Sequence, residues 1–377
     1  MKISSIRITP LRLPLKIPYK WSFGKKSEIT VNLIEIEAEN GIIGYGECTT
    51  APDADAQKIV LEGLSKYFVG RSVYDFSLNS AEAYYGDFLS YGANMPRYFN
   101  QMNSGLDMAA LDLQGKLQGL PVWDLLGGQM RKEVGYFFFL QGRSIDELAQ
   151  HAAKGVADGE PVFYLKVGVN DDYDLAAVKA IREVIGNGRL RVDPNEAWDP
   201  ENCMRMIKAL EPYNVEFIEQ PTKSGSLAVL KQVKQRSPIA LGADQSVFTL
   251  HEVYNACETR AADMIVVGPR EIGGLRPMMK AAAIAEGAGL KICIHSSFST
   301  GITACAEHHI GRAIPNLDDG NQIMWQLVKD NIVKDPALTP IKGKLALEDR
   351  PGLGFDLDYE VVKDAAARHI TYREESY

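Results

Sequence analysis

The chain has 377 residues, 46% of them hydrophobic, which is enough to bury a large core and more than one domain usually contains. Its 41 Lys and Arg against 49 Asp and Glu give a formal charge of −8, and no basic cluster is interleaved with aromatics, so we expect no nucleic-acid partner. No stretch approaches the roughly 20 apolar residues of a membrane span. Five scattered cysteines, none in a CxxC pair, are typical of buried free thiols in a reducing compartment. We therefore expect a cytoplasmic protein.

The first third of the chain is predicted to be an α+β unit. From residue 2 to about 47 the apolar residues are spaced as in strands, which favours an antiparallel meander. Residues of about 55 to 119 change to helical spacing and end at Gly119, before Pro121. The last fifty residues have no such regular rhythm, and we expect them to fold back onto this first unit.

Short apolar runs recur beyond residue 130, each followed by turn residues and a helical stretch. The runs are Tyr136–Leu140, Phe163–Val167, Leu190–Val192, Val215–Ile218, Ile239–Leu241, Met264–Val267 and Lys291–Ile294. They begin about 24 to 28 residues apart, the length of one strand-loop-helix-loop unit, and an eighth is expected near Leu317. An open doubly wound sheet would carry GxGxxG after an early strand, and none is present. The pattern predicts an α/β fold with a (β/α) TIM-type barrel.

Three carboxylates end three successive predicted strands. Asp193, Glu219 and Asp244 are 26 and 25 residues apart, one barrel unit each, so their side chains should meet at one rim of the barrel. Carboxylates packed together repel each other unless a cation neutralises them, and a hard ion with oxygen ligands such as Mg²⁺ suits them best. The alternative is that each acid only forms a turn or caps a helix, as Asp193 before Pro194 would do.

Two further side chains are candidates for acid and base chemistry on the same rim. Lys166 ends the strand before Asp193, and a lysine beside a divalent cation has a lowered pKa, which makes it a usable base. His295 ends the seventh run and is a candidate acid or second base. The alternatives are a lysine that snorkels to the surface and a purely structural histidine.

Several motifs together resemble the mandelate racemase and muconate lactonising enzyme branch of the enolase superfamily, over nearly the whole chain. They are Gly44-Tyr45-Gly46-Glu47, the segment 107–112, the segment 121–128, Asp193-Pro194-Asn195, Glu219-Gln220-Pro221, Ala243-Asp244-Gln245-Ser246, Gly273-Gly274 and Pro351-Gly352-Leu353-Gly354. The resemblance implies removal of a proton α to a carboxylate, with Mg²⁺ stabilising the enolate.

The resemblance also implies a domain layout and further site residues. An α+β capping domain would span 1–130, completed by about 326–377, and the barrel would span 131–325. Two specificity loops, 17–26 and 48–53, would belong to the capping domain, where Trp21 and Phe23 either contact the substrate or only pack the lid. Asn195, Gln245 and Gln322 are further candidates for substrate binding. The expected partner is a small-molecule carboxylate, and relatives of this kind are commonly homo-oligomers.

The sequence departs from the family at two places that bear on the reaction. Tyr164 replaces the first lysine of the usual Lys-x-Lys pair; it can donate a hydrogen bond to a substrate carboxylate but adds no charge. The sixth-strand position five residues before the glycine pair is Gly268, so neither the opposed lysine nor the aspartate that orients the histidine is expected.

Two types of reaction therefore remain open. In β-elimination, Lys166 takes the α-proton, and the enzyme is a dehydratase of acid sugars or hydroxy acids, assisted by His295, or a lactone cycloisomerase. In the second type, His295 acts as a second base and the enzyme is a racemase or epimerase. A third possibility is an inactive barrel retained for binding.

Overall fold

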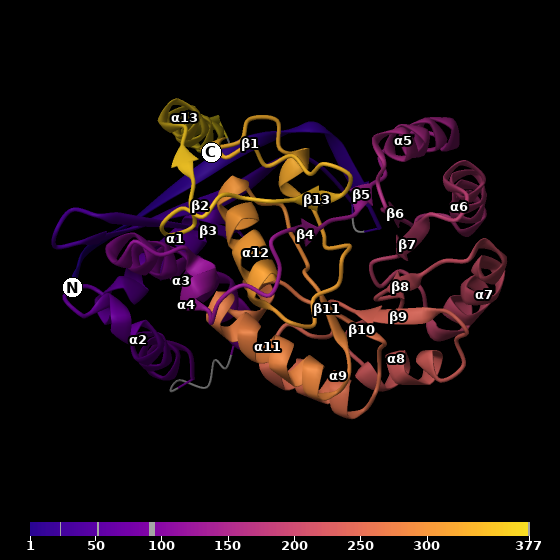
Figure 1. The fold of residues 1–377 in the computed structure, drawn as a ribbon, viewed down its shortest axis with the longest axis horizontal. Coiled ribbons are helices and arrows are strands. Elements are labelled where there is room, and N and C mark those ends of the chain that lie inside the picture. Colours follow the sequence, from indigo (N-terminus) through magenta and orange to yellow (C-terminus); the bar gives the residue numbers. More distant parts are fainter. Residues whose placement is uncertain (23, 51–52, 90–94, 376–377) are drawn as a thin grey trace.

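The computed structural model describes residues 1–22, 24–50, 53–89 and 95–375 and shows two parts packed against each other (Figure 1). A small antiparallel sheet with its helices comes from the first part of the chain, and a curved parallel sheet ringed by helices follows. The predicted barrel-type α/β fold is confirmed. The limits of the two domains stay a prediction.

The antiparallel sheet has the predicted meander order, β1 (Ile3–Trp21), β2 (Gly24–Ala38) and β3 (Ile43–Thr49). Its helices are α1 (Ala54–Leu64), α2 (Phe76–Ala83), α3 (Pro96–Gln118) and α4 (Val122–Leu125). Strand β3 lies so close to α3 that a Cβ on Gly46 would stand 2.1 Å from the carbonyl oxygen of Gly105. Glycine in the Gly-Tyr-Gly-Glu motif therefore allows the sheet and helix to touch.

The parallel sheet contains seven strands in sequential order, and the helices between them cover its outer face (Figure 1). The strands are β5 (Phe138–Phe139), β6 (Val162–Lys166), β7 (Arg189–Asp193), β8 (Phe217–Glu219), β9 (Ala240–Ala243), β10 (Met264–Val266) and β11 (Lys291–Cys293). The helices are α5 (Ile145–Asp158), α6 (Asp171–Ile185), α7 (Pro200–Leu210), α8 (Leu227–Lys234), α9 (Leu250–Glu258), α10 (Pro269–Ile272), α11 (Leu275–Gly287) and α12 (Gly301–Ala313).

The eighth barrel position is filled by isolated pairings instead of a full strand. Leu317 makes a parallel bridge to Ile292 of β11, and Asn321 makes one to Tyr136, just before β5. The amide of Phe137 also donates to the carbonyl of Asn321 at 3.0 Å. These contacts link the two ends of the sheet, at the place where the eighth run was predicted.

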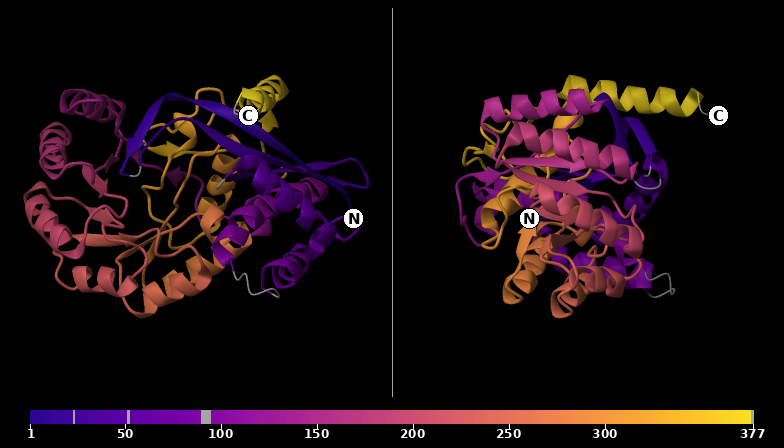
Figure 2. Two further views of the ribbon diagram at one scale, coloured as in Figure 1. Left: turned by 180° about the vertical axis from the view of Figure 1, so that it is seen from behind. Right: turned by 90° about the vertical axis from the view of Figure 1, so that its right-hand side faces the viewer.

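The end of the chain returns to the first part. Two short pairs form there: β13 (Lys344–Leu345) with β4 (Val134–Gly135), and β12 (Val333–Asp335) with β14 (Asp356–Leu357). The final helix α13 (Tyr359–Glu375) lies beside β1, as the turned views also show (Figure 2). All five cysteines are buried and free, as predicted. Among the helices that the structure describes, none combines the length and apolar character that crossing a membrane requires.

Glu47, the acid of the Gly-Tyr-Gly-Glu motif, ties the antiparallel sheet to the barrel. Its carboxylate is 1% exposed and accepts hydrogen bonds from the amides of Thr300 at 2.8 Å and Thr303 at 3.0 Å, at the beginning of α12. It also accepts one from the Thr300 hydroxyl at 2.7 Å. A carboxylate at this position satisfies free amides and complements the helix dipole, so Glu47 caps a barrel helix from outside the barrel.

Asp107 and Asp112 of α3 anchor two further segments of the chain. Asp107 accepts from the amides of Leu275 at 2.7 Å and Arg276 at 3.2 Å, at the start of α11. Asp112 accepts from the amide of Leu353 at 2.7 Å and so fixes the closing segment of the chain. Asp107 therefore joins the antiparallel part to a barrel helix, and Asp112 joins α3 to the closing segment.

Replacing Glu47 with alanine should lower the free energy of unfolding by about 1 to 3 kcal/mol, because the cap is lost and buried amides are left unpaired. Urea unfolding followed by circular dichroism measures the change. Exposed Glu39→Ala is the matched control and should shift it by less than about 0.5 kcal/mol. Equal effects of the two changes would contradict the capping role.

His309 of α12 is predicted to make the fold sensitive to acid. Its Nδ1 accepts from the Trp123 amide at 3.2 Å, and its ring stacks on Trp123 with centroids 4.4 Å apart. Burial, together with the smaller effect of the Arg312 charge, lowers the pKa of His309 to about 3. An unfolded histidine has a pKa of about 6.5. Between these values the unfolded chain binds a proton that the folded chain refuses, so stability falls as pH falls from about 6.5 towards 3.

The His309→Asn variant, which keeps an acceptor for the Trp123 amide, tests this linkage. Between pH 6 and 4 the slope of unfolding free energy against pH should decrease by about 1.4 kcal/mol per pH unit, the value of one proton. Urea titrations at several pH values measure the slope. An unchanged slope would exclude His309 as the source.

Candidate active site

Four of the predicted side chains come from the carboxyl ends of neighbouring strands. Strand β6 ends at Lys166, β7 at Asp193 and β8 at Glu219, while Asp244 directly follows β9. Lys166 and Asp193 are register partners in the sheet, and the Lys166 ammonium forms an ion pair with Asp193 Oδ2. The equal spacing in the sequence thus places these residues on one rim, as parallel strands require.

Tyr164 lies below this rim and connects two of the acids. Its hydroxyl donates to Asp193 Oδ2 at 2.6 Å and lies 3.1 Å from Glu219 Oε1. Lys166 Nζ donates to the same hydroxyl at 3.3 Å. Burial raises the pKa of Tyr164 well above its ordinary value, and the charge of Asp193 adds to the effect. Tyr164 is therefore a neutral donor to the acids, and its hydrogen bond to a substrate carboxylate stays a prediction.

Some acidic oxygens at this rim are buried without a hydrogen-bond partner in the described structure. They are both carboxylate oxygens of Asp244 and Oε2 of Glu219. Burial, together with the negative charge of Asp193, raises the pKa of Asp244 to about 7 and that of Glu219 well above the ordinary range. Unpaired buried carboxylate oxygens are unfavourable, and an ion with oxygen ligands would satisfy them. These three residues fit a hard divalent cation.

Although the chemistry of these acids suits a cation, their side chains are not gathered around a common point in this structure. No three acidic, histidine or cysteine groups within the described ranges lie close enough together to hold one. Lys166 and Tyr164 neutralise and bond Asp193, while Asp244 has only the imidazole of His295 nearby, with Nε2 3.9 Å from Oδ1. The present arrangement balances the negative charge with protein cations.

His295 has an acidic partner that we did not expect. Its Nδ1 lies 3.1 Å from Oε1 of Glu271, which is buried in the short helix α10. The same oxygen accepts a hydrogen bond from Arg270 Nε at 2.6 Å. The expectation that His295 has no acid to orient it was therefore wrong. The sequence position expected to carry this acid is Gly268, shortly after β10. The acid is instead Glu271, three residues later, which the single turn of α10 brings back towards the histidine.

Gly268 is a glycine for a steric reason. A Cβ at this position would lie 2.1 Å from the carbonyl oxygen of His295 and 3.0 Å from Oε2 of Glu271. Real Cβ atoms do not approach backbone oxygens so closely, so this position, between β10 and α10, has no room for a side chain. The Glu271 carboxylate occupies the space next to it.

Glu271 and Asp244 together keep His295 charged. Burial alone lowers the pKa of His295, but the negative charges of Asp244 and Glu271 outweigh it and raise this pKa to about 9. For Lys166 too, burial lowers the pKa, and Asp193, Tyr19 and Glu219 outweigh it, so the pKa lies above the ordinary value of a lysine. Both groups are cations at neutral pH in this arrangement.

The residues predicted to contact the substrate differ in their surroundings. Asn195 donates from Nδ2 to Asp193 Oδ2 at 3.0 Å, and Gln322 donates from Nε2 to Glu219 Oε1 at 2.8 Å, so both bind acids of the rim. Gln245 has a buried Oε1 without a hydrogen-bond partner among the described residues. Trp21 is half-buried, at the end of β1. Phe23 lies outside the described residues.

Tyr19 is a site residue that we did not single out. It belongs to β1, yet its ring lies 5.7 Å from that of Phe139 in β5, where the tip of the β1–β2 ribbon reaches the barrel (Figure 1). Burial raises the pKa of Tyr19 to about 12, and the nearby Lys166 opposes this rise. Only the folding of β1 over the barrel brings Tyr19 to the lysine, so no local pattern in the sequence signals it.

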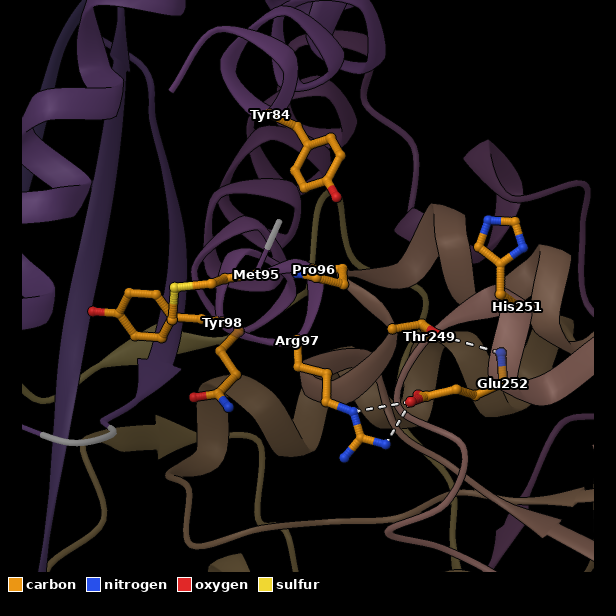
Figure 3. Close-up of a pocket in the computed structure, with 9 residues that line it drawn as sticks. Tyr84, Met95, Pro96, Arg97, Tyr98, Thr249, His251 and Glu252 are labelled. Carbon is orange, nitrogen blue, oxygen red and sulfur yellow. Dashed lines mark hydrogen bonds and ion pairs between the residues drawn. The ribbon is translucent and has the colours of Figure 1, made fainter. Parts of the chain in front are cut away.

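A cavity of about 730 Å³ lies elsewhere, between α3 and α9 (Figure 3). Across it, Arg97 points at Glu252 and donates from Nε at 3.1 Å and from Nη2 at 2.6 Å. The residues that line it are Tyr84, Met95, Pro96, Arg97, Tyr98, Gln101, Thr249, His251 and Glu252. None of them is a strand-end residue of the rim, so we place the candidate site at the rim and not in this cavity.

Two family models match most of the chain. The Enolase C-terminal domain-like model matches residues 147–361, and the Mandelate racemase / muconate lactonizing enzyme, N-terminal domain model matches residues 3–127. The chain belongs to the mandelate racemase and muconate lactonising enzyme branch of the enolase superfamily.

Curated members of this branch resemble the chain over nearly their whole length. An N-succinyl-L-Arg/Lys racemase of Bacillus cereus is 25% identical, with 97% of this chain and 98% of the relative covered. A muconate cycloisomerase 1 of Rhodococcus opacus is 28% identical, with 96% and 98% covered. A hydrophobic dipeptide epimerase of Enterococcus faecalis is 29% identical, with 84% and 89% covered. These relatives are enzymes, and they catalyse different reactions.

Solved structures of the branch share the fold. A muconate lactonizing enzyme from Pseudomonas fluorescens, complexed with muconolactone, has a TM-score of 0.89 at 27% identity, with 97% of this chain and 99% of that chain covered. The dipeptide epimerase from Enterococcus faecalis, complexed with Mg and the dipeptide L-Leu-L-Tyr, has a TM-score of 0.86 at 26% identity, with 94% and 100% covered. Members of this branch thus bind small molecules and, in the epimerase structure, Mg.

Proposed function

We propose that this chain is a Mg²⁺-dependent dehydratase of hydroxy acids or acid sugars. Asp193, Glu219 and Asp244 would hold the ion, supported by the partnerless buried oxygens of Glu219 and Asp244 and by the mutual repulsion of the three acids. When bound, Mg²⁺ supplies positive charge to the carboxylate oxygens of a substrate and to the enolate formed from it.

Lys166 is the proposed base. In the arrangement described, its charge is held by Asp193, Tyr19 and Glu219. A bound Mg²⁺ would neutralise these carboxylates and remove their effect on Lys166. The effect of burial would remain, and burial lowers the pKa of a lysine. Lys166 can then release its proton near neutral pH and accept the α-proton of the substrate. Tyr164, fixed on the acids, keeps Lys166 Nζ in place through their 3.3 Å contact.

The observation that carries the elimination proposal is the placement of His295 between Glu271 and Asp244. Glu271 lies outside the proposed ligand set and favours the protonated form of His295, which is suited to give its proton to a leaving β-hydroxide that departs as water. Glu271 takes Nδ1 and so directs Nε2 towards the rim. To act as the acid in elimination, His295 needs only to be protonated when the substrate reacts.

Epimerisation is the second candidate, because His295 and Lys166 provide two ionisable groups and because racemases and epimerases are among the relatives. In one direction of that reaction His295 would have to accept the α-proton. Glu271, which lies outside the proposed ligand set, stabilises the protonated form of His295 through Nδ1 and so opposes this step. A cycloisomerase, the third candidate, needs no acid for its carboxylate leaving group and would leave His295 without a task.

Magnesium should stabilise the protein through Asp244. At about 100 times its dissociation constant, the ion should add about 2.7 kcal/mol and raise the melting temperature by about 3 °C. Asp244→Asn should remove this response, while exposed Asp172→Asn should keep it. Differential scanning fluorimetry with MgCl₂ or chelator measures both. An undiminished response in Asp244→Asn would rule out this ligand.

Separate variants of the base and the acid should divide the reaction into its two steps. With Mg²⁺ in deuterated water, Lys166→Met should lose both exchange of the α-proton and product formation, by more than about 10³-fold. His295→Asn should retain exchange and lose elimination by about 10² to 10⁴-fold, because enolate formation does not need the acid. Exposed Lys179→Met is the control for the loss of a lysine.

Proton NMR with a library of hydroxy acids, acid sugars, lactones and N-acyl amino acids follows both steps. An unsaturated or keto acid product supports the dehydratase, a lactone or its ring-opened acid supports the cycloisomerase, and inversion at the α-carbon without elimination supports the epimerase. Silence across the library, together with no binding of Mg²⁺, would leave a barrel retained for binding.

A further inference from the structure

The side chains of Lys26 and Tyr19 lie on the same face of the β1–β2 ribbon. The two residues are cross-strand partners in the antiparallel register. Side chains directly opposite each other in such a pair lie on the same face of the sheet. Tyr19 faces Lys166 and the barrel, so Lys26, although exposed, extends towards the candidate active site from the capping sheet.

Phe298, three residues beyond His295, lies beneath both side chains. Its ring centroid is 5.0 Å from that of Tyr19, and Lys26 Nζ is 5.6 Å from the same centroid. Trp21 completes this aromatic surface, with its ring centroid 6.2 Å from that of Phe298. The ammonium of Lys26 is therefore held at the edge of an apolar wall that begins next to the proposed acid.

Arg270 brings a second cation to this region from the barrel. Its Nε donates to Glu271 Oε1, the oxygen that His295 Nδ1 also contacts, so the guanidinium lies close to the imidazole. Its Nη1 donates to Thr49 Oγ1 at 3.3 Å, and Ser297 Oγ contacts the same oxygen at 3.4 Å. The guanidinium is thus fixed at the contact between capping sheet and barrel.

These two cations lack an anion between them. Within the described part of the chain Lys26 makes no ion pair, and the carboxylate bound to Arg270 is the one shared with His295. Partial burial of Lys26 and the positive charge of Arg270 both lower the pKa of Lys26, because the two cations repel each other. A ligand carboxylate placed beside both would remove this repulsion and gain charge-assisted hydrogen bonds.

We propose that Lys26 and Arg270 bind a second carboxylate of the substrate, at the end remote from the metal, and that the enzyme acts on dicarboxylic acids. This inference rests on the function proposed above. One carboxylate is activated at the metal site, and the other lies against the cation pair beyond His295. The leaving group then sits between them, within reach of the histidine. Substrates with an uncharged far end lose the second contact.

The decisive experiment compares acids that differ only at the far end. Six-carbon aldaric acids, including galactarate, are paired with aldonic acids of the same configuration, and N-succinyl amino acids with their N-acetyl analogues. The rate of α-proton exchange with Mg²⁺ is measured for wild type, Lys26→Met, Lys26→Arg and Lys25→Met. Lys25 is exposed and is the cross-strand partner of Lys20, so its side chain points to the opposite face and provides the matched control.

Wild type should prefer the diacid of the accepted pair by at least about 100-fold in kcat/KM, since it alone meets both cations. Lys26→Met should lower kcat/KM for the diacid by about 10-fold, mainly through KM, and for the monoacid by less than about 2-fold. Lys26→Arg should restore most of the loss, and Lys25→Met should change neither. Raising the salt concentration should reduce the difference between wild type and Lys26→Met, because this contact is partly exposed.

The outcomes separate the two proposals. Exchange that depends on Lys166 but is equal for diacid and monoacid, or that falls equally for both in Lys26→Met, overturns the dicarboxylate inference and keeps the proposed function. Absence of exchange with every acid refutes the proposed function. Calorimetric titration of wild type and Lys26→Met with galactarate then decides whether the cation pair binds a dicarboxylate: equal or absent binding overturns it, and weaker binding by the variant supports it.

Discussion

The concentration of negative charge at one rim of the barrel is the constraint on which the rest of the site depends. Asp193, Glu219, Asp244 and Glu271 are all buried there. Burying so many carboxylates is tolerable only if each has a cation or a donor within reach. Lys166, Tyr164, His295 and Arg270 provide them. The groups proposed to perform the chemistry are thus also the groups that make the buried acids compatible with a stable fold.

The same balance couples the proposed acid and base to the metal site. Lys166 and His295 each contact an acid of the proposed ligand set, so their affinities for protons depend on how that set is neutralised. The charge on the rim is shared among a few positions, and a change at one position alters the others. An account of any one of these residues in isolation would be incomplete.

The sequence predicted well the features that recur once in each strand-helix unit, namely the strands and the residues at their ends. The regular spacing of the strands sufficed for the barrel, and it located Lys166, Asp193, Glu219 and Asp244 on one edge, because strand ends in a parallel barrel coincide. It could not locate Glu271, whose position depends on the single turn of α10, or Tyr19, which reaches the barrel only through the curvature of β1 and β2. The partners of Gln322 and Asn195 depend on side-chain directions, which spacing does not determine.

Gly268 limits how this site can change in the course of evolution. A base just after β10, facing Lys166, would need a side chain at a position where even a methyl group meets the backbone of His295 and the carboxylate of Glu271. A substitution there can install such a base only if the backbone oxygen of His295, 2.1 Å from the Cβ position, moves as well as the Glu271 carboxylate, 3.0 Å from it. An opposed base on this side of the barrel would thus require a shift of the backbone that carries His295, together with the acid that orients it.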